Sequence, residues 1–248
     1  MAEAKTPLVR IGDFFFRHRN HVFPAALIIL FLAFKPIHEI FGREDYEEFS
    51  DILGLVLVLG GLALRAVVVG FAYIKRGGLN KQVYADTLVT EGFFKLSRNP
   101  LYCGNMLIYA GLFITHGNPW VIVLGITSFW FIYTAIIAAE EYFLRSKFGE
   151  SYREYCRVTP KWLPDFSKFR AATEGMKFNY KKVLAKDYST FTSAMLALIF
   201  LSMDEIITWG SGFAAEKQSI YKLVACLIAL LLFSLVIRTL KKTGALTV

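Results

Sequence analysis

Two charged stretches read Asp86-Thr-Leu-Val-Thr-Glu-Gly-Phe-Phe-Lys-Leu-Ser-Arg-Asn-Pro-Leu-Tyr-Cys-Gly104 and Glu140-Glu-Tyr-Phe-Leu-Arg-Ser-Lys-Phe-Gly-Glu-Ser-Tyr-Arg-Glu-Tyr155. We call residues 86–104 the first cluster and residues 140–164 the second cluster. The residues between them are apolar and contain Gly117-Asn-Pro119, which predicts a tight connection between two helices. Charged side chains packed against membrane-spanning segments are costly and usually mark a site. We therefore predict that the hairpin brings the two clusters together into one pocket.

The composition is that of a membrane protein. Of the 248 residues, 55% are hydrophobic and 16% are aromatic, and the mean hydropathy is positive. This is too apolar for a soluble domain and typical of a polytopic membrane protein, so we predict an all-α fold. The first apolar run, Phe23 to Phe34, follows several arginines but lacks a small-residue cleavage site. We expect a retained anchor there.

Hydropathy divides the chain into about six transmembrane helices, since a span needs roughly 20 apolar residues. The predicted spans are 21–41, 52–74, 101–116, 118–139, 188–209 and 218–238. The third is short, and Gly104, Gly111 and Gly117 would let it pack closely on its neighbours. The expected organisation is two helices in 1–84, a core in 85–165, an interfacial linker in 166–187 and a carboxyl-terminal helix pair in 188–248.

Basic residues set the expected orientation. Most of the 28 lysines and arginines lie in the amino-terminal segment, the 75–100 connection, the 140–187 stretch and the carboxyl terminus. All of these fall on one side of a six-span arrangement, whereas the acidic segment 42–51 falls on the other. The positive-inside rule then places both termini and both clusters in the cytoplasm. The net charge of +8 is explained by this topology, so we expect membrane lipids and no nucleic acid as partners.

The cysteines and histidines do not form a metal motif. Cys103, Cys156 and Cys226 are scattered along the chain without the spacing of a zinc site or a disulfide framework. We interpret them as small apolar residues and predict no metal.

The residues of the clusters alone leave their role open. Pro100 at the start of a helix leaves amides free for a ligand, although an ordinary interfacial loop has the same composition. Glu140 and Glu141 end an apolar run and need a partner, for which Arg98, Lys95 or a ligand are candidates, although an acid pair at a helix end in solvent is common. The aromatic residues that follow are more often packing than a purine platform.

Residues 86–164 resemble the isoprenylcysteine carboxyl methyltransferase and phospholipid methyltransferase group of integral membrane enzymes. Members carry His-Thr-Leu-Val-Thr-x-Gly-x-Tyr, then Arg-His-Pro-x-Tyr-x-Gly, a hairpin, and Glu-Glu-x-x-Leu-x-x-x-Phe-Gly-x-x-Tyr-x-x-Tyr. Here the first two motifs match as Asp86 to Phe94 and Arg98 to Gly104. The third matches at Glu140-Glu141, Leu144, Phe148-Gly149, Tyr152 and Tyr155.

The resemblance implies a cytoplasmic pocket for S-adenosyl-L-methionine, covered by the second cluster. The residues that would bind this cofactor are Asp86, Thr87, Leu88, Val89, Phe94, Asn99, Pro100, Tyr102 and Glu140. Catalytic roles fall to Arg98 and to Glu141, a candidate to take a proton from an amine acceptor.

Four positions depart from the family pattern. Asp86 and Asn99 replace histidines and Phe94 replaces a tyrosine, but asparagine can keep a hydrogen bond, so cofactor binding is still expected. Ile136 stands where isoprenylcysteine enzymes have an arginine for the substrate carboxylate, which argues against a carboxylate acceptor.

The predicted function is therefore methyl transfer to a lipid-like or small hydrophobic acceptor through nitrogen, sulfur or oxygen, with the acceptor entering laterally from the bilayer. Two alternatives stay open. An NADPH-dependent sterol-type reductase shares a similar Arg-His-Pro-x-Tyr segment, and the substituted pocket positions would also suit a non-catalytic membrane scaffold.

Overall fold

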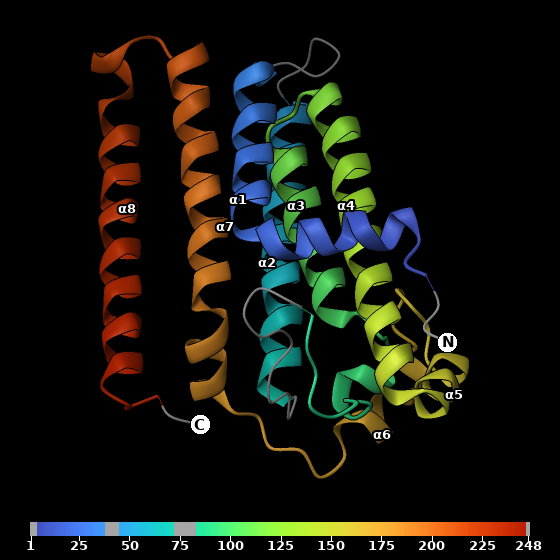
Figure 1. The fold of residues 1–248 in the computed structure, drawn as a ribbon. Helices are drawn as coiled ribbons and strands as arrows, with labels where there is room; N and C mark the ends of the chain where they lie inside the picture. The colour runs from blue at the N-terminus through green and yellow to red at the C-terminus, as the bar shows by residue number, and fades with distance from the viewer. Residues whose placement is uncertain (1–3, 38–44, 72–82, 247–248) are drawn as a thin grey trace.

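The computed structural model describes residues 4–37, 45–71 and 83–246, and within these ranges the chain is helical without strands (Figure 1). The elements are α1 Pro7–Ala33, α2 Asp45–Phe71, η1 Gly92–Lys95, α3 Pro100–Thr115, α4 Pro119–Phe148, α5 Glu150–Val158, η2 Phe166–Lys168, α6 Phe169–Thr173, α7 Tyr180–Trp209 and α8 Phe213–Lys242. The segments 42–51 and 75–100, on which the orientation rests, lie partly outside the described residues.

Four of these helices are long and apolar enough to cross a membrane: Glu48–Phe71, Pro119–Phe148, Tyr180–Trp209 and Phe213–Lys242. The shorter apolar helix α3 runs beside them (Figure 1). This confirms the all-α polytopic membrane fold, and the number of six spans stays a prediction. The short elements η1, α5 and α6 gather at one end of the bundle.

Helix α1 differs from the predicted span 21–41 because it ends at Ala33. Phe34 is already extended, and the Lys35-Pro36 pair that follows disfavours helical geometry at the residue before proline. The Thr6 side chain caps the start of the helix, and Pro24 lies inside it. Figure 1 shows α1 with one leg across the bundle and a second leg parallel to it, a bend of the kind that an internal proline produces.

Helices α2 and α3 pack through glycines, as predicted for Gly104 and Gly111, whereas Gly117 lies in the turn after α3 at φ +74°. A Cβ atom on Gly104 would lie 2.6 Å from the Arg65 Cγ atom, and one on Gly111 would lie 2.5 Å from the Gly54 carbonyl oxygen. The two backbones can approach this closely only because these positions carry no side chain. The predicted hairpin is confirmed as well, since α3 ends at Thr115 and α4 begins at Pro119.

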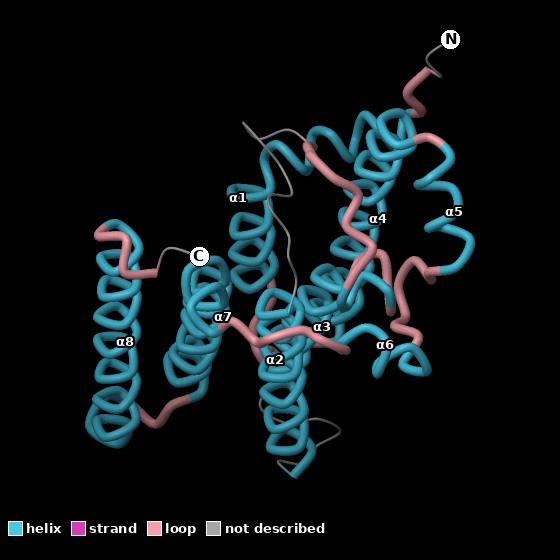
Figure 2. The backbone as a smooth tube through the Cα atoms, turned by 90° about the horizontal axis from the view of Figure 1, so that it is seen from below, coloured by secondary structure: helices cyan, strands magenta, loops and turns pink. Residues whose placement is uncertain are grey.

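Helix α4 continues past the predicted span 118–139 to Phe148, so the acid pair lies inside a helix and not at its end. Gly149, at φ +53°, ends α4 and starts the turn into α5. A left-handed φ favours glycine, so this residue lets the second cluster fold back beneath the bundle. Figure 2, seen from below, shows α5 and α6 on the α3–α4 side of the molecule.

Helix α7 begins at Tyr180, eight residues before the predicted span 188–209. Its first turns carry Lys181, Lys182, Lys186 and Asp187, which a hydropathy window excludes. The Asn179 side chain accepts a hydrogen bond from the Lys182 amide and caps the helix. Helix α7 packs against α2 and α3, and α8 packs against α7 at the outer edge of the molecule (Figure 1).

Candidate active site

One cavity of about 1130 Å³ lies between α1, α2, α3, α4, α5 and α7. Every residue that the sequence assigned to the site lines it. These residues are Asp86, Thr87, Leu88, Val89, Phe94, Arg98, Asn99, Pro100, Tyr102, Glu140 and Glu141. The structure thus brings the two clusters to one place, although the role of each residue stays a prediction.

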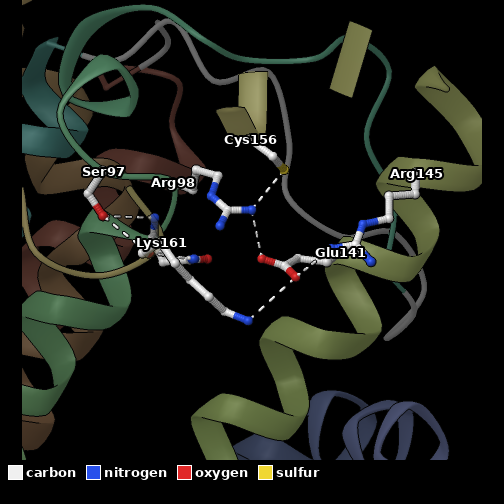
Figure 3. A network of polar contacts seen from close by, with 7 residues as sticks. Ser97, Arg98, Glu141, Arg145, Cys156 and Lys161 are labelled. Carbon is white, nitrogen blue, oxygen red and sulfur yellow. Dashed lines mark hydrogen bonds and ion pairs between the residues drawn. The ribbon is translucent and has the colours of Figure 1, made fainter. Parts of the chain in front are cut away.

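The two clusters are joined by side chains and by backbone. The Arg98 Nη1 atom lies 3.0 Å from the Glu141 Oε1 atom (Figure 3). The Arg98 amide donates to the Pro160 carbonyl oxygen at 2.9 Å, and the Asp165 amide donates to the Leu96 carbonyl oxygen at 2.8 Å. These contacts confirm that the hairpin returns the second cluster to the first.

Glu141 is the centre of a buried ion network. Besides Arg98, its carboxylate contacts Arg145 at 3.3 Å and Lys161 at 3.4 Å (Figure 3). The side chains of Arg98 and Glu141 are only 13% and 11% exposed. Removing one partner of such a pair leaves an uncompensated buried charge, which typically costs about 3–5 kcal/mol. The network therefore fastens α4 to the segments before α3 and after α5.

Arg98 keeps an unpartnered donor. Its Nη1 atom also lies 2.8 Å from the Cys156 sulfur, so this cysteine is more than the small apolar residue that we predicted. Burial acts to lower the pKa of Arg98, but the charge of Glu141 acts in the other direction, and the pKa is raised above its ordinary value. The buried Nε–H has no hydrogen-bond partner among the residues that the structure describes. A buried donor without a partner is costly and suits a polar ligand group.

The α5 tyrosines support the first cluster from below. The Tyr155 hydroxyl donates to the Phe94 carbonyl oxygen at 2.8 Å. Burial raises the pKa of Tyr155, and burial together with the charge of Glu141 raises the pKa of Tyr152. Both hydroxyls therefore stay protonated, and the Tyr155 hydroxyl acts as a hydrogen-bond donor. Both side chains are buried, which fits packing, and both line the cavity.

Glu140 points to a different part of the cavity from Glu141. The Tyr102 hydroxyl donates to its Oε1 atom at 2.9 Å. Because a carboxylate accepts several hydrogen bonds, one partner leaves capacity for a ligand hydroxyl or cation.

Residues 83–89, which we call the strap, line the cavity with seven consecutive positions. They are neither helix nor strand, and no backbone–backbone hydrogen bond joins residues 83–90 to any other described residue. The Lys147 ammonium on α4 donates to the Ala85 carbonyl oxygen. The Tyr84 hydroxyl donates to Asp86 at 2.5 Å, and this hydrogen bond raises the pKa of Tyr84. Backbone groups of the strap are therefore available to a polar ligand.

Asn99, which replaces the family histidine, is held by the second cluster. Its side-chain amide donates to the Lys161 carbonyl oxygen at 2.9 Å, and its backbone amide donates to the Ser97 hydroxyl at 3.2 Å. The Ser97 hydroxyl in turn donates to the Trp162 carbonyl oxygen at 2.8 Å. Asparagine thus keeps a hydrogen bond here, and its side-chain oxygen stays available.

Sequence reasoning missed the other walls of the cavity. Arg65 and Asn105 line it from α2 and α3, and residues of α1 and α7 complete it. The signal for Arg65 was present, because an arginine inside an apolar span usually faces a cavity or a partner. The contribution of α7 carries little sequence signal, since its lining residues are apolar and small hydroxyl side chains, whereas α1 adds Arg19 and Asn20 to its apolar lining residues.

Comparison with known proteins identifies relatives of this chain. The phospholipid methyltransferase family profile matches residues 49–151. The cobalt-zinc-cadmium resistance protein CzcN of Cupriavidus metallidurans is 31% identical over 163 residues, covering 64% of this chain and 70% of the relative. A probable protein-S-isoprenylcysteine O-methyltransferase of Oryza sativa subsp. indica is 31% identical over 118 residues, covering 47% of this chain and 62% of the relative. No solved structure shows a significant match.

A further relative is the protein-S-isoprenylcysteine O-methyltransferase A of Arabidopsis thaliana, 31% identical over 113 residues, which cover 45% of this chain and 57% of the relative. The chain thus spans less than two thirds of the length of these plant enzymes. The matched region contains both cavity clusters up to the start of α5. This chain belongs to the isoprenylcysteine carboxyl methyltransferase and phospholipid methyltransferase group of integral membrane methyltransferases.

Proposed function

We propose that this protein transfers a methyl group from S-adenosyl-L-methionine to a lipid-like acceptor. One observation carries the proposal: a single cavity joins a polar end, built by the two clusters, to an apolar arm between α1 and α7. Methyl transfer of this kind needs both reactants side by side in a dry pocket, and holding them there supplies much of the rate enhancement.

The residues at the polar end fit this cofactor. Apart from the Ala85 carbonyl, which Lys147 contacts, the strap offers backbone groups that make no backbone–backbone hydrogen bond to described residues. Arg98 adds a buried N–H without a partner among those residues. Glu140 offers carboxylate oxygens for ribose hydroxyls or for positive charge. The strap, Asn99, Tyr102 and Glu140 would hold the cofactor, which supplies an electrophilic methyl group on a sulfonium. The chain itself then needs to bind the two reactants, orient them and exclude water.

The geometry favours a positioning role for Glu141. Its carboxylate is engaged by three cations, so its contacts hold the Arg98 side chain and the segment around Pro160 in place. We therefore assign Glu141 to shaping the pocket in preference to accepting a proton from the acceptor. Arg98 remains at the cavity wall, where its buried Nε–H has no partner among the described residues.

The apolar arm suits a long hydrocarbon chain. Helix α1 lines it with Phe23, Pro24, Leu27, Ile28 and Phe31, and α7 with Ala194, Leu196, Ala197 and Phe200. The rings of Phe31 and Phe200 stack with centroids 6.4 Å apart. Ile28 is 53% exposed and Phe200 is 40% exposed, so this wall is open to the surrounding lipid. We infer that the acceptor enters from the bilayer between α1 and α7.

The orientation of the site is also a proposal. The excess of basic residues in 140–187 and at both ends of the chain favours a cytoplasmic position for them. Figure 1 places the carboxyl-terminal end of α8 in the same half of the bundle as α6. The cofactor would then reach the polar end of the cavity from the cytoplasm, where α5 and α6 lie beside it.

Cofactor binding tests the proposal. Protein purified in detergent and placed in lipid nanodiscs should bind S-adenosyl-L-methionine and its demethylated product at micromolar concentrations in a calorimeter, and NADPH poorly. Glu140→Ala should abolish this binding. Glu154→Ala, which removes an exposed carboxylate of α5 paired with Arg157, is the matched control and should bind normally.

The alternatives give different results in the same experiment. Tight NADPH binding would favour the sterol-type reductase, and binding of neither molecule would favour the scaffold. Unaltered binding by Glu140→Ala would remove this residue from the site.

A further inference from the structure

Arg65 is a buried cation inside a membrane-spanning helix. It lies six residues before the end of α2 at Phe71, which places it about 9 Å inside the helix end. Its side chain is 12% exposed and lines the cavity. Charged residues in such positions nearly always face a cavity or a partner, and Arg65 has both.

The partners of Arg65 come from α7 and α3. Both oxygens of Asp187 accept hydrogen bonds from it, the Nε bond at 3.2 Å. The Thr190 hydroxyl accepts from Nη2 at 3.2 Å, and the Asn105 side-chain oxygen accepts from Nη1 at 2.6 Å. A guanidinium has five N–H donors, and these four contacts leave one on Nη1.

Asp187 contacts Arg65 but does not itself line the cavity. It is 6% exposed, whereas Arg65, Asn105 and Thr190 line the cavity. The carboxylate thus compensates the charge of the guanidinium from the protein side and leaves its other edge toward the cavity. Asp187 belongs to α7, outside the matched family region 49–151, so this arrangement is a feature of the carboxyl-terminal part of this chain.

The cavity wall around Arg65 offers uncharged donors. The Thr190 hydroxyl hydrogen is not used in the contact with Arg65, and the Asn105 amide nitrogen lies near the Tyr133 hydroxyl, which also lines the cavity. Ser189 and Ser193, which are four residues apart on α7, also line the cavity. Together with the remaining Nη1 donor, these groups suit an oxygen atom that accepts hydrogen bonds.

We propose that Arg65, Asn105 and Thr190 recognise an uncharged oxygen-bearing headgroup, such as an alcohol or carbonyl, and that Asp187 sets this preference by neutralising Arg65. The inference rests on the proposed function, because it places the methyl acceptor's headgroup in the same cavity. The alternative, an anionic headgroup, would meet an Arg65 that is already ion-paired, and Ile136 occupies the α4 position where isoprenylcysteine enzymes have an arginine for the substrate carboxylate. Arg19 of α1 also lines the cavity, but its charge interacts with the Glu140 carboxylate.

Photolabelling of the full chain in phosphatidylcholine nanodiscs tests the preference for an uncharged headgroup. Two probes carry the same mid-chain diazirine on a hexadecyl chain, one ending in a hydroxyl and the other in a permanently ionised sulfonate. The wild type should be labelled several-fold more by the alcohol, at peptides of α3 and α7. Asp187→Asn should reverse the ratio, because Arg65 then becomes an uncompensated cation.

Two further variants keep the test decisive if Asp187→Asn folds poorly. Thr190→Val keeps the shape but removes the hydroxyl, and should lower alcohol labelling without raising sulfonate labelling. Asp204→Asn makes the same change on α7 at a residue that does not line the cavity, and should behave as wild type.

The outcomes separate this inference from the proposed function. Equal or stronger sulfonate labelling of the wild type, or an unchanged ratio in a folded Asp187→Asn protein, would overturn the headgroup assignment. Binding of S-adenosyl-L-methionine is measured on the same samples. Loss of cofactor binding with the alcohol preference intact would instead contradict the proposed function and support the headgroup site.

Discussion

At the scale of single residues, two groups of charges at the cavity are arranged as compensated pairs. Glu141 forms ion pairs with Arg98, Arg145 and Lys161. A second carboxylate, Asp187, forms an ion pair with Arg65. Buried ions are tolerated only when they are paired, because transfer out of water costs several kcal/mol for each ion. Glu140 lies outside both arrangements and keeps its carboxylate toward the cavity with the Tyr102 hydroxyl as a partner.

Glu141→Ala should destabilise the protein by about 3–5 kcal/mol, because it leaves the buried Arg98 guanidinium unpaired. The measurement is the loss of the folded population with temperature in a fixed detergent. Glu150→Ala is the matched control, since it breaks a pair with Arg153 in which both side chains are mostly exposed. Such a surface pair contributes at most about 1 kcal/mol. Equal effects of the two substitutions would contradict a structural role for Glu141.

At the scale of elements, the site depends on how closely α2 and α3 approach. Gly54 and Gly61 of α2 face Gly111 and Gly104 of α3, and this contact brings Arg65 beside the α3 backbone. The same packing places Asn105 within hydrogen-bond distance of Arg65. Because helices in lipid gain no hydrophobic driving force from each other, close backbone packing is a main source of their association.

Gly111→Ala should destabilise this contact by about 1–3 kcal/mol, the usual cost of overpacking. The added Cβ atom would lie 2.5 Å from the Gly54 carbonyl oxygen, which belongs to a helix backbone and cannot move aside easily. Thermal unfolding in detergent is the measurement.

Gly60→Ala on α2 provides the control, since an added Cβ atom there meets nothing within 4 Å. Alanine favours helix by about 1 kcal/mol over glycine, so this variant should be neutral or more stable. A Gly111→Ala protein as stable as Gly60→Ala would show that the α2–α3 contact is looser than described.

At the scale of the whole molecule, the cavity is assembled from segments that are far apart in the chain. The strap, the α3 start and α4 belong to the family core, whereas α1 and α7 close the apolar arm from either side. Helix α8 packs on α7 at the edge and lies away from the cavity, so its contribution to the site is to support α7 (Figure 1).

The predicted orientation is testable with reporter fusions. A fluorescent protein fused after Val248 should fluoresce in a bacterial host, and alkaline phosphatase fused there should be inactive, because the basic carboxyl terminus is expected to stay in the cytoplasm. Fusions at Ser211, between α7 and α8, should give the opposite pattern. Active phosphatase at the carboxyl terminus would reverse the proposed sidedness of the site.

Much of the fold followed from local patterns. The hairpin at Gly117–Pro119, the short α3 and its glycine contacts were predictable because turn residues, apolar length and small residues act locally. Helix ends were less predictable. Hydropathy stopped α4 at residue 139 and started α7 at residue 188, but helix hydrogen bonding continues through charged residues to Phe148 and back to Tyr180.

The sequence by itself determined that the chain is an all-α membrane protein and that Arg98 and the acid pair lie near each other, since ordered motifs around a short hairpin leave few other arrangements. Only the tertiary structure decided which partner each charge takes. Arg65 and Asp187 are 122 residues apart in the chain, and their pairing depends on the packing of α2 against α7. Such long-range contacts follow from how whole helix faces fit, which no local pattern records.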